Sequence, residues 1–164
     1  MAGELVPAWI KELNAEEEKE ERARREFQLA QSLIRSKVPE IWEDFIRELT
    51  IQVNACKLLS SVRNPRLDDV SQSNPPEKAY KVTMYGSGPF GKVRATTVRL
   101  KTDGAMPYIE CLCDAIEDEK DYKINFRVNP VGEVELIISG GATPQMAAEH
   151  VVRSMATGIN KLLG

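Results

Sequence analysis

The chain has 164 residues, a length typical of a single domain whose core needs no cross-links. Its 25 acidic and 22 basic side chains give a formal charge of −3, which disfavours nucleic-acid binding that depends on phosphate neutralisation. Its three cysteines, Cys56, Cys111 and Cys113, form an odd set, which favours a reducing compartment over a disulfide framework.

No run approaches the roughly 18 apolar residues that span a bilayer, so we expect no membrane insertion. The first residues lack both the basic leader and the continuous apolar stretch of a secretory signal. These features predict a cytoplasmic protein.

Residues 1–15 are predicted to form an N-terminal arm. If residues 7–14 are helical, one small apolar face is made by Leu5, Trp9, Ile10 and Leu13. Such a face either closes the domain's own core or docks onto another chain.

Residues 16–63 are predicted to be helical, with a break near Pro39. Glutamate and arginine at helical spacing favour a solvated first helix over 16–26. Pro39 lacks an amide donor and disfavours helical geometry at Val38, so we expect a second helix to start there. This second helix carries a long apolar stripe that includes Ile41, Trp42, Phe45, Ile46, Leu49 and Val53. The two helices together are longer than the predicted sheet, so an overhang is expected.

Residues 64–77 contain three prolines among polar residues and are predicted to be a linker or mobile loop. Residues 78–164 are predicted to form an antiparallel sheet plus a C-terminal helix, within a single compact domain overall. Strand patterns cover 79–85, 92–101, 107–116, 121–128 and 133–139, and short connections indicate a meander. Thr143 and Pro144 begin the last helix, which should pack on one sheet face. The predicted fold class is α+β with two N-terminal helices and five strands.

Residues 86–93 read Gly-Ser-Gly-Pro-Phe-Gly-Lys-Val, which resembles the glycine-rich phosphate loop of protein kinases. The resemblance implies phosphate or nucleotide binding by Gly86, Gly88, Gly91 and Lys92. However, the chain has no His-Arg-Asp and no Asp-Phe-Gly, and hence neither the catalytic base nor the metal-binding aspartate of that family. The alternative interpretation is a hairpin connection in which the glycines permit positive φ.

A ligand pocket is the next candidate site. It is predicted to lie between a curved sheet and the helices and to be lined by Tyr80, Met84, Tyr108, Phe126 and Met155.

The polar sheet face resembles a single-stranded nucleic-acid platform in principle, although acidic side chains share it. Its candidate residues are Lys81, Thr83, Tyr85, Lys123, Asn125 and Arg127. Cys111, Cys113 and His150, the sole histidine, do not make a zinc set, so no metal or other cofactor is predicted.

The leading hypothesis is a non-enzymatic protein that self-associates or binds a protein partner through its N-terminal helices. It rests on the excess helix length and on the missing catalytic residues. One alternative is binding of a small molecule or lipid-like ligand in the pocket between sheet and helices. The other is phosphate or nucleotide binding at the loop from Gly86 to Lys92.

Overall fold

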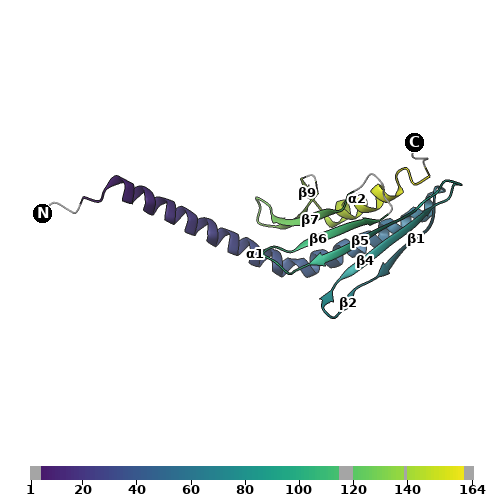
Figure 1. Ribbon diagram of the computed structural model, residues 1–164, viewed down its shortest axis with the longest axis horizontal. Helices are drawn as coiled ribbons and strands as arrows, with labels where there is room; N and C mark the ends of the chain where they lie inside the picture. The colour runs from purple at the N-terminus through teal and green to yellow at the C-terminus, as the bar shows by residue number, and fades with distance from the viewer. Residues whose placement is uncertain (1–4, 115–119, 139, 161–164) are drawn as a thin grey trace.

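The structure is a computed structural model that describes residues 5–114, 120–138 and 140–160. Residues 1–4 of the predicted arm, 115 and 116 of the third predicted strand, 139 of the fifth and 161–164 of the last segment lie outside the described residues. The fold class is α+β, with a long N-terminal helix, a curled antiparallel sheet and a C-terminal helix (Figure 1).

The elements in chain order are α1 (Ala8–Ala55), the 3₁₀ turn η1 (Cys56–Leu58), β1 (Val62–Asp69), β2 (Gln72–Ser73), β3 (Pro76–Glu77), β4 (Ala79–Gly86), β5 (Val93–Lys101), β6 (Tyr108–Asp114), β7 (Tyr122–Val128), β8 (Val134–Ile137), β9 (Gly141–Ala142) and α2 (Pro144–Ala156). The main sheet has seven strands in the order β1-β4-β5-β6-β7-β8-β9, all antiparallel. Strands β2 and β3 form a separate hairpin. Among the described residues, no helix combines the length and apolar character needed to cross a bilayer.

Both helices pack on the same face of the main sheet, because alternate strand residues and one face of each helix belong to a common core. Helix α1 buries Ile34, Val38, Trp42, Phe45, Leu49 and Val53 there. The sheet contributes side chains such as Val82 and Met84 of β4, Val98 of β5 and Ile124 of β7. The opposite sheet face is not covered by either helix.

The prediction of two N-terminal helices is wrong: α1 runs unbroken from Ala8 to Ala55 with Pro39 inside it. Pro39 removes one helical hydrogen bond, an effect worth about 3 kcal/mol in a helix interior. Ile34 and Val38 before it and Trp42 after it are all buried in the same core. Each such side chain stabilises the packed helix by about 1.5–3 kcal/mol, so tertiary packing outweighs the local preference for a break.

The prediction of five strands is also incomplete. Strands β4 to β8 correspond to the five predicted strands, but β1 and β9 extend the sheet at its two edges. The segment predicted to be a linker or loop, residues 64–77, instead holds most of β1 and the whole β2–β3 hairpin. Pro65 is tolerated because β1 is an edge strand and its pairing with β4 is irregular between Arg63 and Arg66.

The C-terminal helix begins as predicted. The Thr143 hydroxyl accepts a hydrogen bond from the Met146 amide at 3.2 Å, and Pro144 occupies the first turn. At the other end of α2, the Arg94 guanidinium of β5 donates to the carbonyl oxygens of Met155 at 2.8 Å and Thr157 at 2.7 Å. A cation at this position also interacts favourably with the helix dipole, so Arg94 joins the end of α2 to the sheet.

Candidate functional site

The N-terminal half of α1 extends beyond the rest of the molecule (Figure 1). No core residue precedes Ile34 in the described chain. The most N-terminal hydrogen bonds between α1 and the body are made by Gln31, to the carbonyl oxygen of Ala105, and by Arg35, to that of Gly104 at 2.6 Å. From Ala8 to Ala30 the helix therefore projects for about 35 Å at 1.5 Å per residue. We call this segment, residues 8–30, the projecting half of α1.

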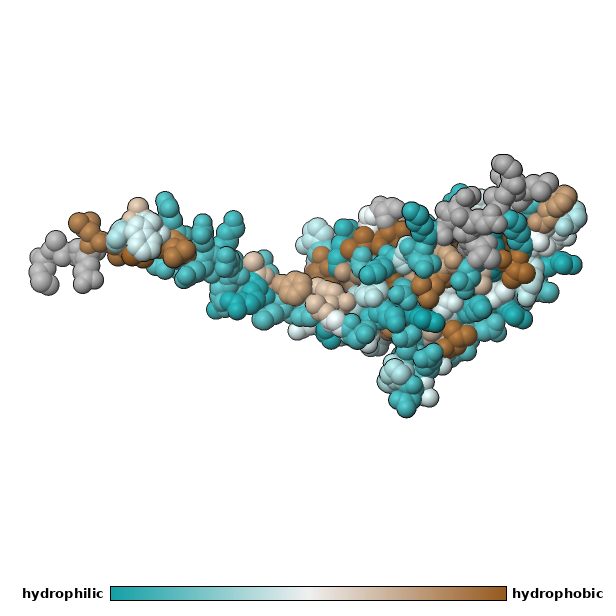
Figure 2. Space-filling view, viewed as in Figure 1, coloured by the Kyte–Doolittle hydropathy of each residue, from teal (hydrophilic) through white to brown (hydrophobic). Residues whose placement is uncertain are grey.

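Apolar side chains on this projecting half are exposed at its two ends. Trp9 is 65% exposed and Leu13 48% exposed near the tip, where Leu5 precedes the helix at 95% exposure. Phe27 is 48% exposed near the body. Figure 2 shows apolar surface at the tip and near the body, separated by a hydrophilic middle. These exposed apolar side chains make the projecting half of α1 the candidate interaction surface.

The structure brings three of the four predicted interaction residues together. Trp9 and Ile10 lie on the first turn of α1 and Leu13 on the next, and Leu5 lies just before its start. Within the described residues none of them joins the hydrophobic core. The self-docked alternative, in which this apolar face closes the core of its own domain, is therefore not the arrangement seen.

The middle of the projecting half is held by local charges. Glu21 forms ion pairs with Arg24 and, at 3.4 Å, with Arg25. Such pairs on an exposed helix contribute only about 0.3–0.5 kcal/mol each. Most of the stability of a helix in a protein comes from packing of its apolar face, so a partner surface would further stabilise this segment.

Of the residues predicted to line a pocket, four belong to the core or pack against it, and Tyr108 lies on the other side of the sheet. Met84, Phe126 and Met155 are buried side chains of the core. Tyr80 packs against Trp42 with ring centroids 6.2 Å apart. Tyr108 lies on the opposite sheet face, where the ammonium group of Lys123 sits 4.5 Å from its ring centroid.

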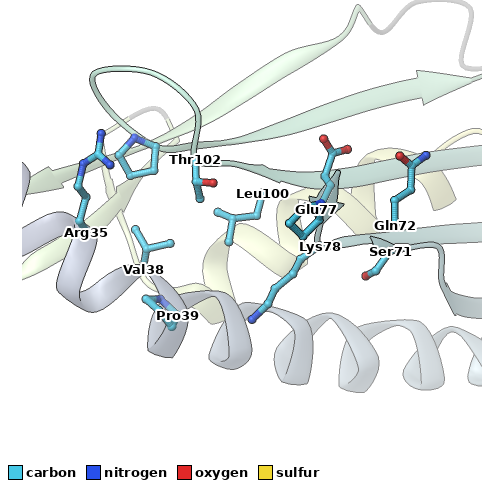
Figure 3. A pocket seen from close by; sticks show the side chains of 11 residues that line it. Arg35, Val38, Pro39, Ser71, Gln72, Glu77, Lys78, Leu100 and Thr102 are labelled. Carbon is cyan, nitrogen blue, oxygen red and sulfur yellow. The ribbon is translucent and has the colours of Figure 1, made fainter. Parts of the chain in front are cut away.

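A groove of about 490 Å³ lies instead where α1, the β2–β3 hairpin and the end of β5 meet (Figure 3). Its apolar side chains include Val38, Pro39 and Leu100, and its charged ones are Arg35, Glu77 and Lys78. Figure 3 shows Lys78 extending toward α1 across this space. Sequence reasoning missed the groove because the β2–β3 hairpin was predicted to be an irregular linker.

The carboxylate of Glu77 at the groove is already paired. It accepts a hydrogen bond from the Lys101 ammonium at 2.9 Å and lies 3.5 Å from the Arg99 guanidinium. The hydrogen bond to Glu77 raises the pKa of Lys101. The groove therefore presents Arg35 and Lys78 as its cationic groups without a competing unpaired carboxylate from Glu77.

The predicted phosphate loop connects β4 to β5, and its amide groups donate within the protein. Within the loop, the amide of Gly86 donates to the carbonyl oxygen of Lys92, and that of Gly91 to the carbonyl oxygen of Gly88. Other amides donate to segments outside the loop: Ser87 to the carbonyl oxygen of Ser61, Gly88 to Asn160 Oδ1 and Lys92 to the carbonyl oxygen of Ile159. A phosphate cradle needs amides that point at the ligand. Nucleotide binding here stays a prediction, and titration with millimolar ATP, followed by the amide chemical shifts of Gly86, Gly88 and Gly91, would test it.

The glycines of this loop are explained by close packing and not by positive φ, which none of the three adopts. A β-carbon on Gly91 would lie 2.3 Å from the Gly86 carbonyl oxygen, and one on Gly86 would lie 2.4 Å from Asn160 Oδ1. At Gly88 the nearest atom would be at 3.5 Å, an ordinary contact. Two of the three glycines are thus required by close packing, since a β-carbon on Gly86 would also lie 2.6 Å from the Gly91 α-carbon.

The open face of the sheet carries the residues considered for nucleic-acid binding. Lys81, Thr83 and Tyr85 of β4 lie on it, and two strands, β5 and β6, separate them from Lys123, Asn125 and Arg127 of β7. Acidic groups neutralise part of this surface, as shown by the 2.6 Å contact between Arg127 and Glu135. Glu110 also pairs in register with Lys123.

The buried thiols of Cys111 and Cys56 have low reactivity. Burial raises the pKa of Cys111 from 9.0 to about 12 and also raises that of Cys56. Because the protonated thiol is a poor nucleophile, neither side chain is suited to covalent catalysis at neutral pH. In the part of the chain that the structure describes, no three His, Cys, Asp or Glu side chains gather closely enough to hold a metal ion.

We expect Cys111 and Cys56 to resist alkylation by iodoacetamide at pH 8 in the native protein and to react after unfolding. The raised pKa also means that the unfolded chain loses the Cys111 proton first. Stability from this thiol is therefore fully present below about pH 9 and is lost as the pH rises toward 12. Peptide mass spectrometry measures the labelling, and unfolding of Cys111→Ala beside the parent isolates the pH effect. Rapid native labelling of Cys111 would contradict the expectation.

Comparison of the chain with protein-family models, with curated proteins and with solved structures found no match.

Proposed function

We propose that this chain is a non-enzymatic protein that associates with itself or with another protein through the projecting half of α1. The observation that carries the proposal is a helix about 35 Å beyond the body whose exposed apolar side chains gather at its two ends. Binding a partner along such a helix buries these side chains and stabilises a segment that its own fold leaves unsupported.

Light scattering on the full chain at micromolar concentration, with a pull-down from its native lysate, tests the proposal. We expect a mass above the 18.4 kDa of one chain, a captured partner, or both. A strict monomer that captures nothing would remove the proposed function.

Replacing Trp9 with glutamate is expected to weaken the association at least tenfold, because the charge stays solvated and the indole area is lost from the contact. Val131→Glu is the matched control, since Val131 is also exposed but lies in the turn between β7 and β8 on the body. The association constants of the two variants are compared by light scattering. Equal weakening by both would place the contact elsewhere on the molecule.

The groove supports a second candidate function, the binding of a small apolar ligand with a negatively charged group. Its volume of about 490 Å³ falls within the range of small-molecule sites, and Val38 and Leu100 lie near the cationic Arg35 and Lys78. Native mass spectrometry should show a co-purified ligand, and Lys78→Glu should weaken the binding of a fluorescent fatty acid. Lys57→Glu, on the 3₁₀ turn outside the groove, is the control. A native mass equal to that of the chain alone, together with no binding of the fatty acid, would count against this candidate.

A further inference from the structure

Several apolar side chains in the N-terminal part of α1, Trp9, Leu13 and Phe27 among them, recur at the spacing of a coiled coil. Because α1 is one continuous helix, residues alternately three and four positions apart share one face. Along the helix to the edge of the body, this stripe consists of Trp9, Leu13, Glu16, Glu20, Ala23, Phe27, Ala30 and Ile34, of which Ile34 is already buried in the core of its own copy. All are apolar except Glu16 and Glu20, in the hydrophilic middle that separates the two apolar ends in Figure 2.

A parallel pair of these helices is disfavoured by charge. In a parallel pair each stripe residue meets its own copy, so Glu16 would face Glu16 and Glu20 would face Glu20. The residues on either side of the stripe would also meet like charges: Lys19 would lie beside Arg24 of the second copy, and Glu12 beside Glu17 of the second copy. Like charges at these positions oppose association.

An antiparallel pair can avoid every one of these conflicts. In one register Leu13 lies beside Ala30 of the second copy, Glu16 beside Phe27 and Glu20 beside Ala23. On either side of the stripe, Lys19 then lies beside Glu26 of the second copy, and Glu17 beside Arg24 of the second copy. Because the pair is two-fold symmetric, each of these opposite-charge contacts occurs twice.

Neighbouring antiparallel registers are worse. If the two helices slide by seven residues so that the two bodies move apart, Glu16 meets Glu20 of the second copy. Sliding them seven residues closer carries both Trp9 and Leu13 past Ile34, onto the stretch of α1 that the body covers, and sets Glu16 against the buried Ile34, whereas in the register above only Trp9 reaches that level. Charge and the position of the body therefore select the same register.

We propose that two copies of this chain pair antiparallel through residues 9–34 of α1, with Leu13 of each copy beside Ala30 of the other. The inference rests on the proposed function and commits it to a second copy as the partner. Each Trp9 then packs at the level of Ile34 of the other copy, where the second copy's body begins. The pairing covers both apolar ends of the projecting half at once.

Cysteine cross-linking of the full chain tests orientation and register, in a background where half-buried Cys113 is replaced by serine. Leu13→Cys with Ala30→Cys should give a covalent dimer under mild oxidation. Leu13→Cys alone should not, because the two sulfur atoms lie about 26 Å apart in this register. Leu13→Cys with Ala23→Cys, which matches the register seven residues away, is the control.

Charge exchange gives an independent measurement. Within the described chain neither Lys19 nor Glu26 has an ion-pair partner of its own, so their exchange leaves no local pair broken. Lys19→Glu or Glu26→Lys alone should weaken dimerisation about tenfold, because two attractive pairs become repulsive. The double variant should restore the parent association constant.

The outcomes separate the inference from the function on which it rests. Cross-linking by Leu13→Cys alone, or in the control pair only, would overturn the proposed register while leaving self-association intact. A chain that stays monomeric but captures a different protein would overturn the pairing and leave the proposed function standing. A monomer that captures nothing would remove both.

Discussion

Replacing Leu49 with alanine is expected to lower the free energy of unfolding by about 2–5 kcal/mol. The Leu49 side chain is fully buried on the face of α1 that packs on the sheet, near the centre of the core. Truncation removes its burial and leaves a cavity between helix and sheet that rigid neighbours fill only in part. Chemical denaturation of the full chain measures the effect.

Leu29→Ala is the matched control for this first prediction. Leu29 lies on the same helix but on the projecting half, is 71% exposed and falls outside the coiled-coil stripe. Its truncation should change the free energy of unfolding by no more than about 0.5 kcal/mol. Equal effects at the two leucines would show that α1 does not pack as described.

Replacing Gly91 with alanine is expected to destabilise the protein by about 1–3 kcal/mol. The new β-carbon would lie 2.3 Å from the carbonyl oxygen and 2.8 Å from the α-carbon of Gly86. Both atoms belong to the backbone where β4 ends, and Gly86 itself donates to the Lys92 carbonyl, so the clash cannot be relieved by rotating a side chain. Thermal unfolding of the variant beside the parent is the measurement.

Gly88→Ala is the control for this second prediction, since its β-carbon would make only ordinary contacts with the Asn160 side chain. The two interpretations of the loop differ here. A phosphate cradle depends on close backbone approach at all its glycines, whereas packing alone requires Gly86 and Gly91. A large loss of stability at Gly88 with none at Gly91 would contradict the packing explanation.

The central strands could be predicted because their signal is local. Tyr122, Ile124, Phe126 and Val128 alternate with polar residues, and the structure places the four apolar side chains on the helix-covered face of β7. The start of α2 could be predicted for the same reason, since Thr143 supplies the cap and Pro144 the first turn, and neither depends on a distant contact.

The edge strands were missed because their signal is not local. The sequence around Pro65 has little apolar alternation, and β1 forms only because β4 offers it an unpaired edge. The groove depends on the β2–β3 hairpin in the same segment, so it was missed for the same reason. Met84, Phe126 and Met155 were assigned to a pocket because a pattern of apolar residues does not distinguish a filled interior from a hollow one.

The sequence by itself determined the α+β class, the positions of the central strands along the chain, the cap of α2 and the apolar residues at the tip of the chain. Each of these follows from neighbours within a few positions, where backbone preference and side-chain periodicity operate. Only the tertiary structure decided that α1 passes through Pro39 without a break, because burial of Val38 and Trp42 against the sheet outweighs the lost hydrogen bond. That continuity aligns Trp9 and Phe27 on one projecting helix, which neither local preference nor spacing across a predicted break could establish.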